Sequence, residues 1–280
     1  MKKLIPTVLS FTAVSLVLSA CGGGAEAEPV STGKGPAGLV KAGEVSFCTD
    51  PEYPPMEYYA DGSSGDPIGF DSDAAVALAE LWGAEPKFVP MAFDGLMPGL
   101  QAERCDVLWT ALYMSPERLE VADGTPYLKT GPGLITPSGD DSIKSADDLS
   151  GKTVAVQGGG SNEETLRALS AEFEASGRSG IKVQPYPKTS ETVAAVMNGK
   201  ADALIETDVA VVDMIAKSNG KLQSVPDVFE ATTDFGVFTV KGSELSAAVK
   251  DGVRELATNG TLAEIAEEYG LDPDRIITGE

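Results

Sequence analysis

The chain has 280 residues, a formal net charge of −22 at pH 7 and no histidine. A surface this acidic repels nucleic acid and anionic lipid headgroups, which argues against both as partners. The sequence contains no motif for a metal or an organic cofactor, and we predict neither.

The N-terminus has the order of a bacterial export signal. Two lysines precede an apolar run over 4–18, which ends in small residues before Cys21. The run is too short to span a bilayer comfortably, so a cleaved signal peptide is favoured over a permanent transmembrane helix. The sequence LSAC at 18–21 resembles the lipobox of bacterial lipoproteins, which implies that residues 1–20 are removed and that Cys21 carries lipid.

Residues 21–42 are predicted to form a lipidated N-terminus and a flexible tether, because Gly, Ala, Glu and Pro dominate and almost nothing can be buried. Several acyl chains on one residue hold a protein firmly at a membrane. We therefore expect an extracytoplasmic protein anchored through Cys21, on the outer face of the cell membrane or in the periplasm.

Strand-like and helical patterns alternate after the tether, beginning with a βαβ unit. Asp71 is predicted to cap a helix whose apolar face includes Ala75, Leu78 and Ala79, and Asp94 to cap the next helix. The elements predicted here are strands at 45–49, 86–89 and 107–110 and a second helix at 95–102. Their alternation indicates a parallel sheet.

The same pattern restarts after the breaker sequence TGPG at 130–133. Ser161 or Asn162, and later Ser190, are predicted helix caps. The elements predicted from here on are strands at 153–156, 181–184 and 203–205, helices reaching 176 and 198, a helix at 207–216, a strand from 236, and helices at 244–258 and 262–269. Two α/β units joined by breakers suggest two lobes.

Cys48 and Cys105 are the cysteines that remain when Cys21 is set aside. An even number in an oxidising compartment predicts a disulfide, and two isolated buried thiols are the alternative.

Ordered motifs give the body of the chain a recognisable pattern. They are TDPEYPP at 49–55, GFDSD at 69–73, FDGLMPGL at 93–100, MSPER at 114–118, DLSGK at 148–152 and NGT at 259–261. Over nearly all of 43–270 the chain thereby resembles the extracellular solute-binding proteins of polar amino acid ABC transporters, including the periplasmic glutamine and histidine receptors.

This resemblance implies an α/β fold of two Rossmann-like lobes joined by a two-strand hinge, the periplasmic binding protein type 2 fold. Lobe 1 would comprise 43–130 plus 237–280, and lobe 2 would comprise 131–236. A ligand cleft between the lobes would close on binding. The resemblance also implies a non-enzymatic monomer with an ABC permease and its ATPase as partners.

The resemblance assigns the ligand's α-carboxylate to Arg118, because the family uses the matching arginine for it and a guanidinium can make two parallel bonds to one carboxylate. A surface arginine paired with a neighbouring glutamate is the alternative. Tyr53 and Phe93 match the family's aromatic pair around the ligand, with core packing as the alternative. Asp50 either accepts from a ligand amine or caps the following turn.

The loop after the strand at 153–156 lies before a helix, so its amides should face the cleft. It ends in Gly160 and Ser161, where the family often has a threonine that completes the carboxylate site, and Gln157 precedes them. A tight turn explains the glycines equally well. The loop lacks the ending of a nucleotide-binding P-loop.

The main departure from the family is Thr207, which stands where relatives place the aspartate that binds the ligand's ammonium. The adjacent acids, Glu206 and Asp208, are candidates to replace it. Ala111 and Tyr113 also differ from the small residues of relatives.

These differences predict a ligand that keeps a carboxylate but has a modified, cyclic or alkylated nitrogen, or a cation away from the α-carbon. An ordinary amino acid, bound by Glu206 or Asp208, is the alternative. The other functions considered are a dehydratase-like enzyme with Glu206 as general acid and a sensory lipoprotein.

Overall fold

The structure is a computed structural model that describes residues 35–229 and 233–279. The predicted signal peptide, the lipidation site at Cys21 and most of the predicted tether lie outside these residues. Among the described residues, no helix combines the length and the apolar character needed to cross a membrane.

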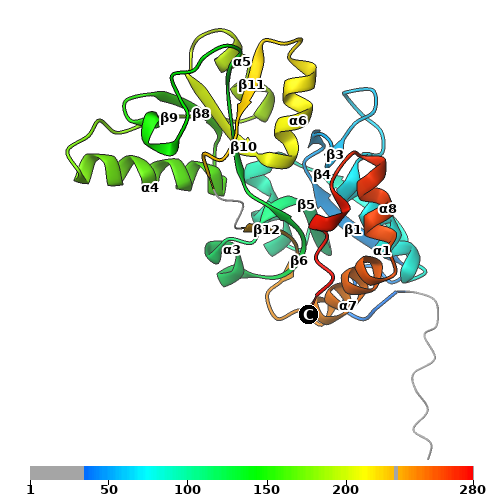
Figure 1. The fold of residues 1–280 in the computed structure, drawn as a ribbon. Helices are drawn as coiled ribbons and strands as arrows, with labels where there is room; N and C mark the ends of the chain where they lie inside the picture. The colour runs from blue at the N-terminus through cyan, green and yellow to red at the C-terminus, as the bar shows by residue number, and fades with distance from the viewer. Residues whose placement is uncertain (1–34, 230–232, 280) are drawn as a thin grey trace, which may run out of the picture. The chain divides into compact units, whose positions relative to one another are not determined.

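The first of the two large sheets has the strand order β4-β1-β5-β12-β6 (Figure 1). Its strands are β1 (Glu44–Thr49), β4 (Glu85–Pro90), β5 (Val107–Tyr113), β6 (Ala122–Thr130) and β12 (Thr233–Val240). Strand β1 pairs in parallel with β4 and β5, whereas β12 runs antiparallel to both β5 and β6. The associated helices are α1 (Phe70–Leu81), α2 (Leu96–Gln101), α3 (Pro116–Val121), α7 (Leu245–Thr258) and α8 (Thr261–Glu268).

Helix α1 begins at Phe70, and the prediction that Asp71 caps it is wrong. Gly69 precedes the helix with a φ of 121°, and a Cβ there would lie 2.3 Å from the carbonyl oxygen of Met56. Only glycine fits this approach. Asp71 lies inside the first turn and is fully buried, so its carboxylate serves the core rather than the helix end.

The second large sheet has the order β11-β7-β10-β8-β9 and its own apolar core. Its strands are β7 (Pro132–Pro137), β8 (Thr153–Gln157), β9 (Lys182–Tyr186), β10 (Ala203–Thr207) and β11 (Leu222–Val225). The helices are α4 (Ser161–Ala175), α5 (Thr189–Met197) and α6 (Asp208–Lys217). Short segments complete the fold: β2 (Glu52–Tyr53), β3 (Glu57–Tyr58), and the 3-10 turns η1 (Phe93–Gly95), η2 (Ala146–Leu149) and η3 (Pro273–Arg275).

Three further cap predictions are wrong by one or two residues. Asp94 lies inside η1 and α2 starts after Gly95; Ser190 lies inside α5, which follows Lys188. Gly160 is the N-cap of α4, so neither Ser161 nor Asn162 caps it. For α4 and α5 a polar residue of the first turn resembled the cap that precedes it, and Asp94 comes one residue before the cap of α2.

The chain passes between the two sheets twice. Strand β6 of the first sheet ends at Thr130 and β7 of the second begins at Pro132, within the predicted breaker. The return strand, β12, pairs with β6 from Thr233 onward. Helices α7 and α8 then pack against β6 and α1, so the C-terminal helices belong to the first sheet. The lobe boundaries at 130/131 and 236/237 remain a prediction.

Cys48 in β1 and Cys105, just before β5, form a disulfide with their Cα atoms 5.5 Å apart. Both are almost fully buried beside Leu96, Leu100 and Leu108. The bridge therefore fastens two strands of the first sheet through its apolar core.

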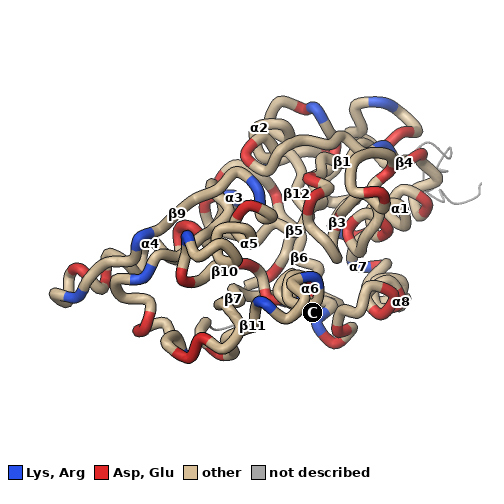
Figure 2. The backbone as a smooth tube through the Cα atoms, turned by 90° about the horizontal axis from the view of Figure 1, so that it is seen from above, with Lys and Arg blue, Asp and Glu red and all other residues tan. Residues whose placement is uncertain are grey.

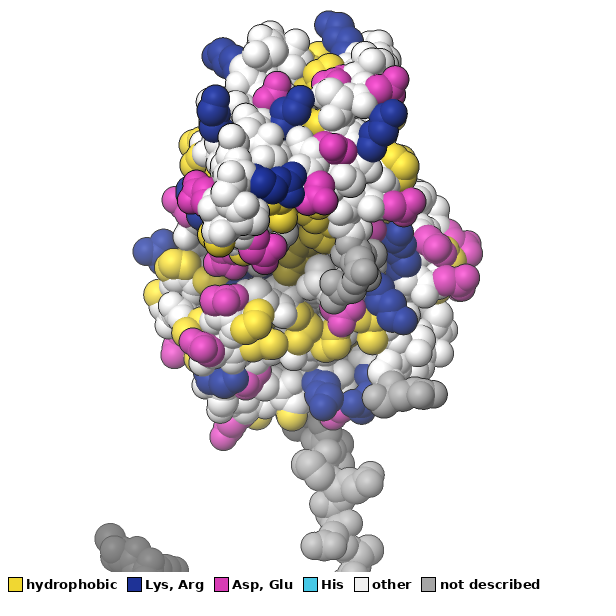
Figure 3. All heavy atoms as spheres, turned by 60° about the vertical axis from the view of Figure 1, so that its left-hand side comes forward, with side chains coloured by type: hydrophobic (Ala, Val, Ile, Leu, Met, Phe, Trp, Pro, Cys, Tyr) yellow, Lys and Arg dark blue, Asp and Glu magenta, His cyan; other side chains and the backbone are white. Residues whose placement is uncertain are grey.

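Charged residues of both signs are distributed over both sheets and their helices (Figure 2). On the face drawn in Figure 3, acidic and basic side chains surround a recess where apolar side chains gather. The acidic excess is thus spread over the surface, as expected of a general contribution to solubility rather than of one acidic interface.

Candidate ligand-binding site

One pocket collects residues from both large sheets and encloses about 620 Å³, including space open to solvent. The predicted residues that line it are Asp50, Tyr53, Phe93, Ala111, Tyr113, Arg118, Gln157, Gly160, Ser161, Glu206 and Thr207. Asp208 is the predicted site residue that does not line it.

Strand ends explain why distant residues meet here. Asp50 follows β1, Tyr113 ends β5, Gln157 ends β8 and Thr207 ends β10. The carboxyl ends of parallel strands lie at one edge of a sheet, and the loops there form the ligand sites of open α/β folds. The two sheets present these edges to the same pocket.

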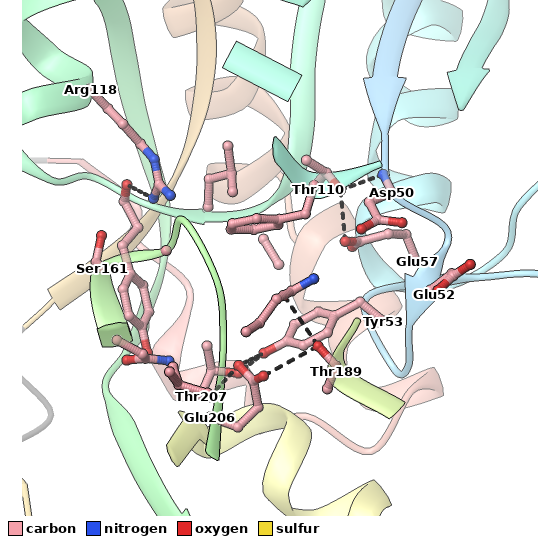
Figure 4. Close-up of a pocket in the computed structure, with 18 residues that line it drawn as sticks. Asp50, Glu52, Tyr53, Glu57, Thr110, Arg118, Ser161, Thr189, Glu206 and Thr207 are labelled. Carbon is pink, nitrogen blue, oxygen red and sulfur yellow. Dashed lines mark hydrogen bonds between the residues drawn. The ribbon is translucent and has the colours of Figure 1, made fainter. Parts of the chain in front are cut away.

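Arg118 lies at one end of the pocket, opposite Asp50 and Glu57 (Figure 4). It sits in the first turn of α3, where Ser115 caps the helix, and its guanidinium donates to the carbonyl oxygen of Tyr113 at 2.8 Å. Burial lowers the pKa of Arg118. Among the described residues it forms no ion pair, so the predicted alternative of a glutamate-paired surface arginine is not what the structure shows.

The N-terminus of α4 lies on the same side as Arg118. Ser161 is the first residue of this 15-residue helix, and Ser161 and Arg118 point toward the same part of the pocket (Figure 4). Unpaired N–H groups and the helix dipole favour a negative charge at such an end. This part of the pocket therefore combines a guanidinium with helix amides, the groups that a carboxylate prefers.

The second-sheet loop approaches the ring of Phe93 at Gly160. A Cβ at Gly160 would lie 3.4 Å from the ring, in ordinary van der Waals contact with it. Gly159, by contrast, has a φ of +79° and serves the tight turn. The tight-turn interpretation of the loop therefore applies to Gly159, whereas Gly160 lines the pocket.

Three buried polar atoms in the pocket wall have no hydrogen-bond partner within the described part of the chain. Two of these atoms lie near Arg118, the Tyr113 hydroxyl and the Asn162 side-chain oxygen, and the third is Oε2 of Glu57. The Tyr113 ring stacks on Phe235 with centroids 5.4 Å apart, which holds the hydroxyl in place. Unsatisfied buried polar groups are costly, so these atoms are ready for partners that a bound molecule or water supplies.

Of the two acids next to Thr207, Glu206 lines the pocket and Asp208 does not. One oxygen, Oε1, accepts from the Tyr53 hydroxyl at 2.8 Å and from the backbone N–H of Thr207 at 2.9 Å. Oε2 accepts a weak bond from Thr189 at 3.4 Å. An ionised carboxylate has about four acceptor sites, so Glu206 can still accept from a ligand. Burial raises its pKa.

Tyr53 connects the two sheets directly across the pocket. Besides Glu206, its hydroxyl contacts the Thr207 hydroxyl at 2.5 Å. At the pocket rim Lys188 forms an ion pair with Glu52 at 2.5 Å. These contacts hold the two walls together, so Tyr53 is more than a core side chain.

Asp208 is committed elsewhere, and its prediction as a pocket residue is wrong. Its carboxylate accepts from Arg275 at 2.6 Å and from the Thr130 hydroxyl at 2.7 Å. As the first residue of α6 it points away from the end of β10, because successive residues leave a strand in different directions.

Acidic residues line the end of the pocket opposite Arg118 (Figure 4). Burial, and then the charge of Glu52, raise the pKa of Asp50 to about 6. The backbone N–H of Asp50 donates to the Thr110 hydroxyl at 3.0 Å, and that hydroxyl donates to Glu57 at 2.7 Å. Asp50 is thus placed for a ligand cation rather than for capping alone.

Several pocket residues were not predicted from the sequence: Glu52, Glu57, Thr110, Leu112, Val156, Asn162 and Thr189. Glu57 lies four positions after Tyr53, so its closeness to the motif TDPEYPP at 49–55 could have indicated it. Thr110 and Thr189 look like ordinary strand and helix residues, and only tertiary pairing brings them to the pocket. No cluster of acidic or sulfur ligands within 35–229 and 233–279 is arranged to hold a metal ion.

A pocket between two α/β units, with a cationic end and acidic walls, defines a receptor for a small polar solute. The family model described as bacterial extracellular solute-binding proteins, family 3, matches residues 45–272. The chain belongs to this family.

Curated relatives and solved structures agree with that assignment. The chain is 32% identical to the L-cystine-binding protein TcyJ of Escherichia coli over 79% of its length and 80% of that protein. It is 31% identical to the arginine-binding extracellular protein ArtP of Bacillus subtilis, over 79% and 84%. An ancestral arginine-binding protein bound to arginine matches with a TM-score of 0.74 at 28% identity, over 81% of this chain and 98% of that one. The prediction of a two-lobed type 2 periplasmic binding protein fold is confirmed.

Proposed function

We propose that this protein is the amino-acid-binding component of an ABC importer, and that it delivers its ligand to a membrane permease. The proposal is carried by the distribution of charge in the pocket. The guanidinium of Arg118, which forms no ion pair among the described residues, lies at one end, and the carboxylates of Asp50, Glu57 and Glu206 line other parts of the wall. Relatives named for arginine and cystine binding support it.

The ligand's α-carboxylate is placed at Arg118 and the amides of Ser161, where charge-assisted hydrogen bonds come from both sheets. Its α-ammonium is placed at Glu206, which takes over from the aspartate that Thr207 replaces. The side chain then extends between Phe93 and Tyr53 toward Asp50. This orientation favours an α-amino acid with a second cation at its far end, such as L-arginine, over a ligand with an alkylated nitrogen.

Closure of the two lobes couples ligand binding to transport. A ligand held by both walls stabilises the closed form, because it contributes contacts that the open form lacks. The lobes are assigned to 43–130 plus 237–280 and to 131–236. The permease and its ATPase would receive the closed, monomeric receptor outside the cytoplasm.

The anchor is a further part of the proposal, supported by the lipobox-like sequence before Cys21. Mass spectrometry of membrane-extracted protein should show an acylated cysteine as the first residue. An unmodified chain that starts elsewhere would disprove the anchor and leave the binding function untouched.

A dehydratase-like activity is the second candidate, since an ancestral amino acid-binding precursor of cyclohexadienyl dehydratase shares the fold with a TM-score of 0.70 at 27% identity. Glu206, whose pKa is raised by burial, would be the general acid. Binding without chemistry is favoured, because the curated relatives reported above are named as binding proteins.

A thermal-shift screen tests the proposal. L-arginine, L-lysine, L-cystine, L-glutamine, glycine betaine and a polyamine are added to the purified protein, and product formation is followed in parallel. A ligand at 100 times its Kd stabilises the native state by about 2.7 kcal/mol, so a cationic amino acid should raise Tm clearly. Stabilisation by glycine betaine alone would favour the alkylated ligand, and a new product would favour the enzyme.

A further inference from the structure

Two carboxyl groups are buried against each other beneath the pocket. Glu57 in β3 is 2% exposed and Asp71 in α1 is 0% exposed. The two acids are neighbours, because the backbone N–H of Asp71 donates to the carbonyl oxygen of Met56 at 2.8 Å and the two carboxyls accept from the adjacent residues Thr110 and Ala111. Glu57 also lines the pocket, whereas Asp71 lies behind it.

The remaining neighbours of the pair bring hydrogen-bond donors but no compensating positive charge. Asp71 accepts from the Tyr127 hydroxyl at 2.7 Å and from the backbone N–H of Ala111 at 2.5 Å. Glu57 accepts from the Thr110 hydroxyl through Oε1, while Oε2 has no partner among the described residues.

Beyond these contacts, the charged group that faces Glu57 is Asp50, and the Trp109 indole faces Asp71. No lysine or arginine of the described chain forms an ion pair with either carboxyl.

Two ionised carboxylates in contact and away from water repel each other strongly, so such pairs hold a proton between them. The donors around the two acids are unequal. Asp71 has the stronger set, which stabilises its ionised form, so the proton belongs mainly to Glu57. Burial raises the pKa of Asp71 to about 7 and the pKa of Glu57 well above its ordinary range.

We infer that the Glu57–Asp71 pair holds one proton in the ligand-free protein and releases it to solvent when a cationic group of the ligand reaches Glu57. The inference rests on the proposed function for the identity of that group. A guanidinium or ammonium beside Glu57 replaces the proton's charge, so the pair becomes doubly ionised at no net cost in local charge. Binding of a dicationic amino acid is then linked to the release of up to about one proton.

Linkage makes the affinity depend on pH in a specific direction. Because binding releases a proton, the affinity for a cationic ligand rises with pH across the range in which the pair titrates. A neutral side chain, as in L-glutamine, displaces no proton from this pair, so its affinity should rise less with pH than the affinity for L-arginine. The pair therefore selects for a distal charge and also sets the pH at which the receptor binds it best.

Isotope-edited infrared spectroscopy of the full chain, with labelled glutamate and aspartate carboxyls, tests whether the pair holds a proton in the absence of ligand. At pH 7 the spectrum should contain the band of a protonated, buried carboxyl. Glu57→Gln should remove this band, whereas Glu80→Gln, which removes an exposed acid of the same helix α1 that carries Asp71, should leave it. Absence of the band in the wild-type protein at pH 7 would overturn the inference.

Calorimetry in buffers of different ionisation enthalpy tests whether a cationic ligand releases this proton, with L-arginine and L-glutamine as probes. L-arginine should release close to one proton from the wild-type protein and none from Glu57→Gln, which should also bind it roughly tenfold or more weakly. Binding of L-arginine without proton release would refute the linkage. If no amino acid binds, the proposed function fails and the displacement step with it, while the infrared result still stands for the ligand-free pair.

Discussion

Arg118 is the residue on which carboxylate recognition depends. We expect Arg118→Ala to weaken amino acid binding by roughly 1.5–3 kcal/mol, because charged hydrogen bonds of a buried guanidinium are lost. Arg118→Lys should fail nearly as badly, since an ammonium cannot form the two parallel bonds. Calorimetry measures both affinities, and Glu117→Gln, at an exposed neighbour, is the matched control. Unchanged binding in both Arg118 variants would remove this residue from the site.

The neighbours Glu206 and Asp208 should respond differently to neutralisation. Glu206→Gln should reduce affinity at least tenfold, about the worth of one charged hydrogen bond, because its carboxylate faces the ligand. Asp208→Asn should chiefly lower the free energy of unfolding, since it breaks the pair with Arg275. Binding and urea-unfolding measurements on both variants separate the roles. A larger loss of affinity in Asp208→Asn would contradict the assignment.

Individual pocket residues were predicted well from the sequence wherever a motif was present. Arg118, Tyr53 and Phe93 were identified from ordered motifs, and all three line the pocket. Sequence alone could not choose between Glu206 and Asp208, because the direction in which each leaves the strand end depends on its tertiary partners. The role of Asp71 was hidden for the same reason: a buried acid and a helix cap look alike in sequence.

The disulfide acts at the scale of elements, because it joins β1 to the loop before β5 across a separation of 57 residues. Replacing both cysteines, in Cys48→Ser/Cys105→Ser, should lower the free energy of unfolding by about 2–4 kcal/mol. Denaturant unfolding measures the change, with Cys21→Ser as a control that spares the bridge. Two reactive thiols in the denatured, unreduced parent protein would show that the bridge does not form.

Elements with local periodicity were predicted, and elements defined by distant pairing were not. The helix at 262–269 and the strand at 45–49 correspond to α8 and β1 within a residue or two. Strand β6 escaped prediction because it contains Gly124 and Pro126, which break strand patterns, and it is held by pairing with β12. Its partner lies about a hundred residues away, beyond the reach of any local signal.

The stability of the whole molecule should depend on pH through its buried acids. Burial raises the pKa of Asp50 to about 6 and also raises the pKa values of the buried Glu57–Asp71 pair, so the native state binds more protons than the unfolded state between pH 4 and pH 7. The free energy of unfolding of the ligand-free protein should therefore fall as pH rises through this range. Denaturant titrations at several pH values measure it. A stability that rises steadily from pH 5 to pH 8 would be inconsistent with these raised pKa values.

The central claim is that the pocket binds an amino acid with a second positive charge. Isothermal titration of the purified protein with L-arginine tests it most directly, with L-glutamine and glycine betaine as competitors. We expect one site per chain, tight binding of L-arginine, and weaker binding of both competitors. Tight binding of glycine betaine with no measurable binding of L-arginine would contradict it.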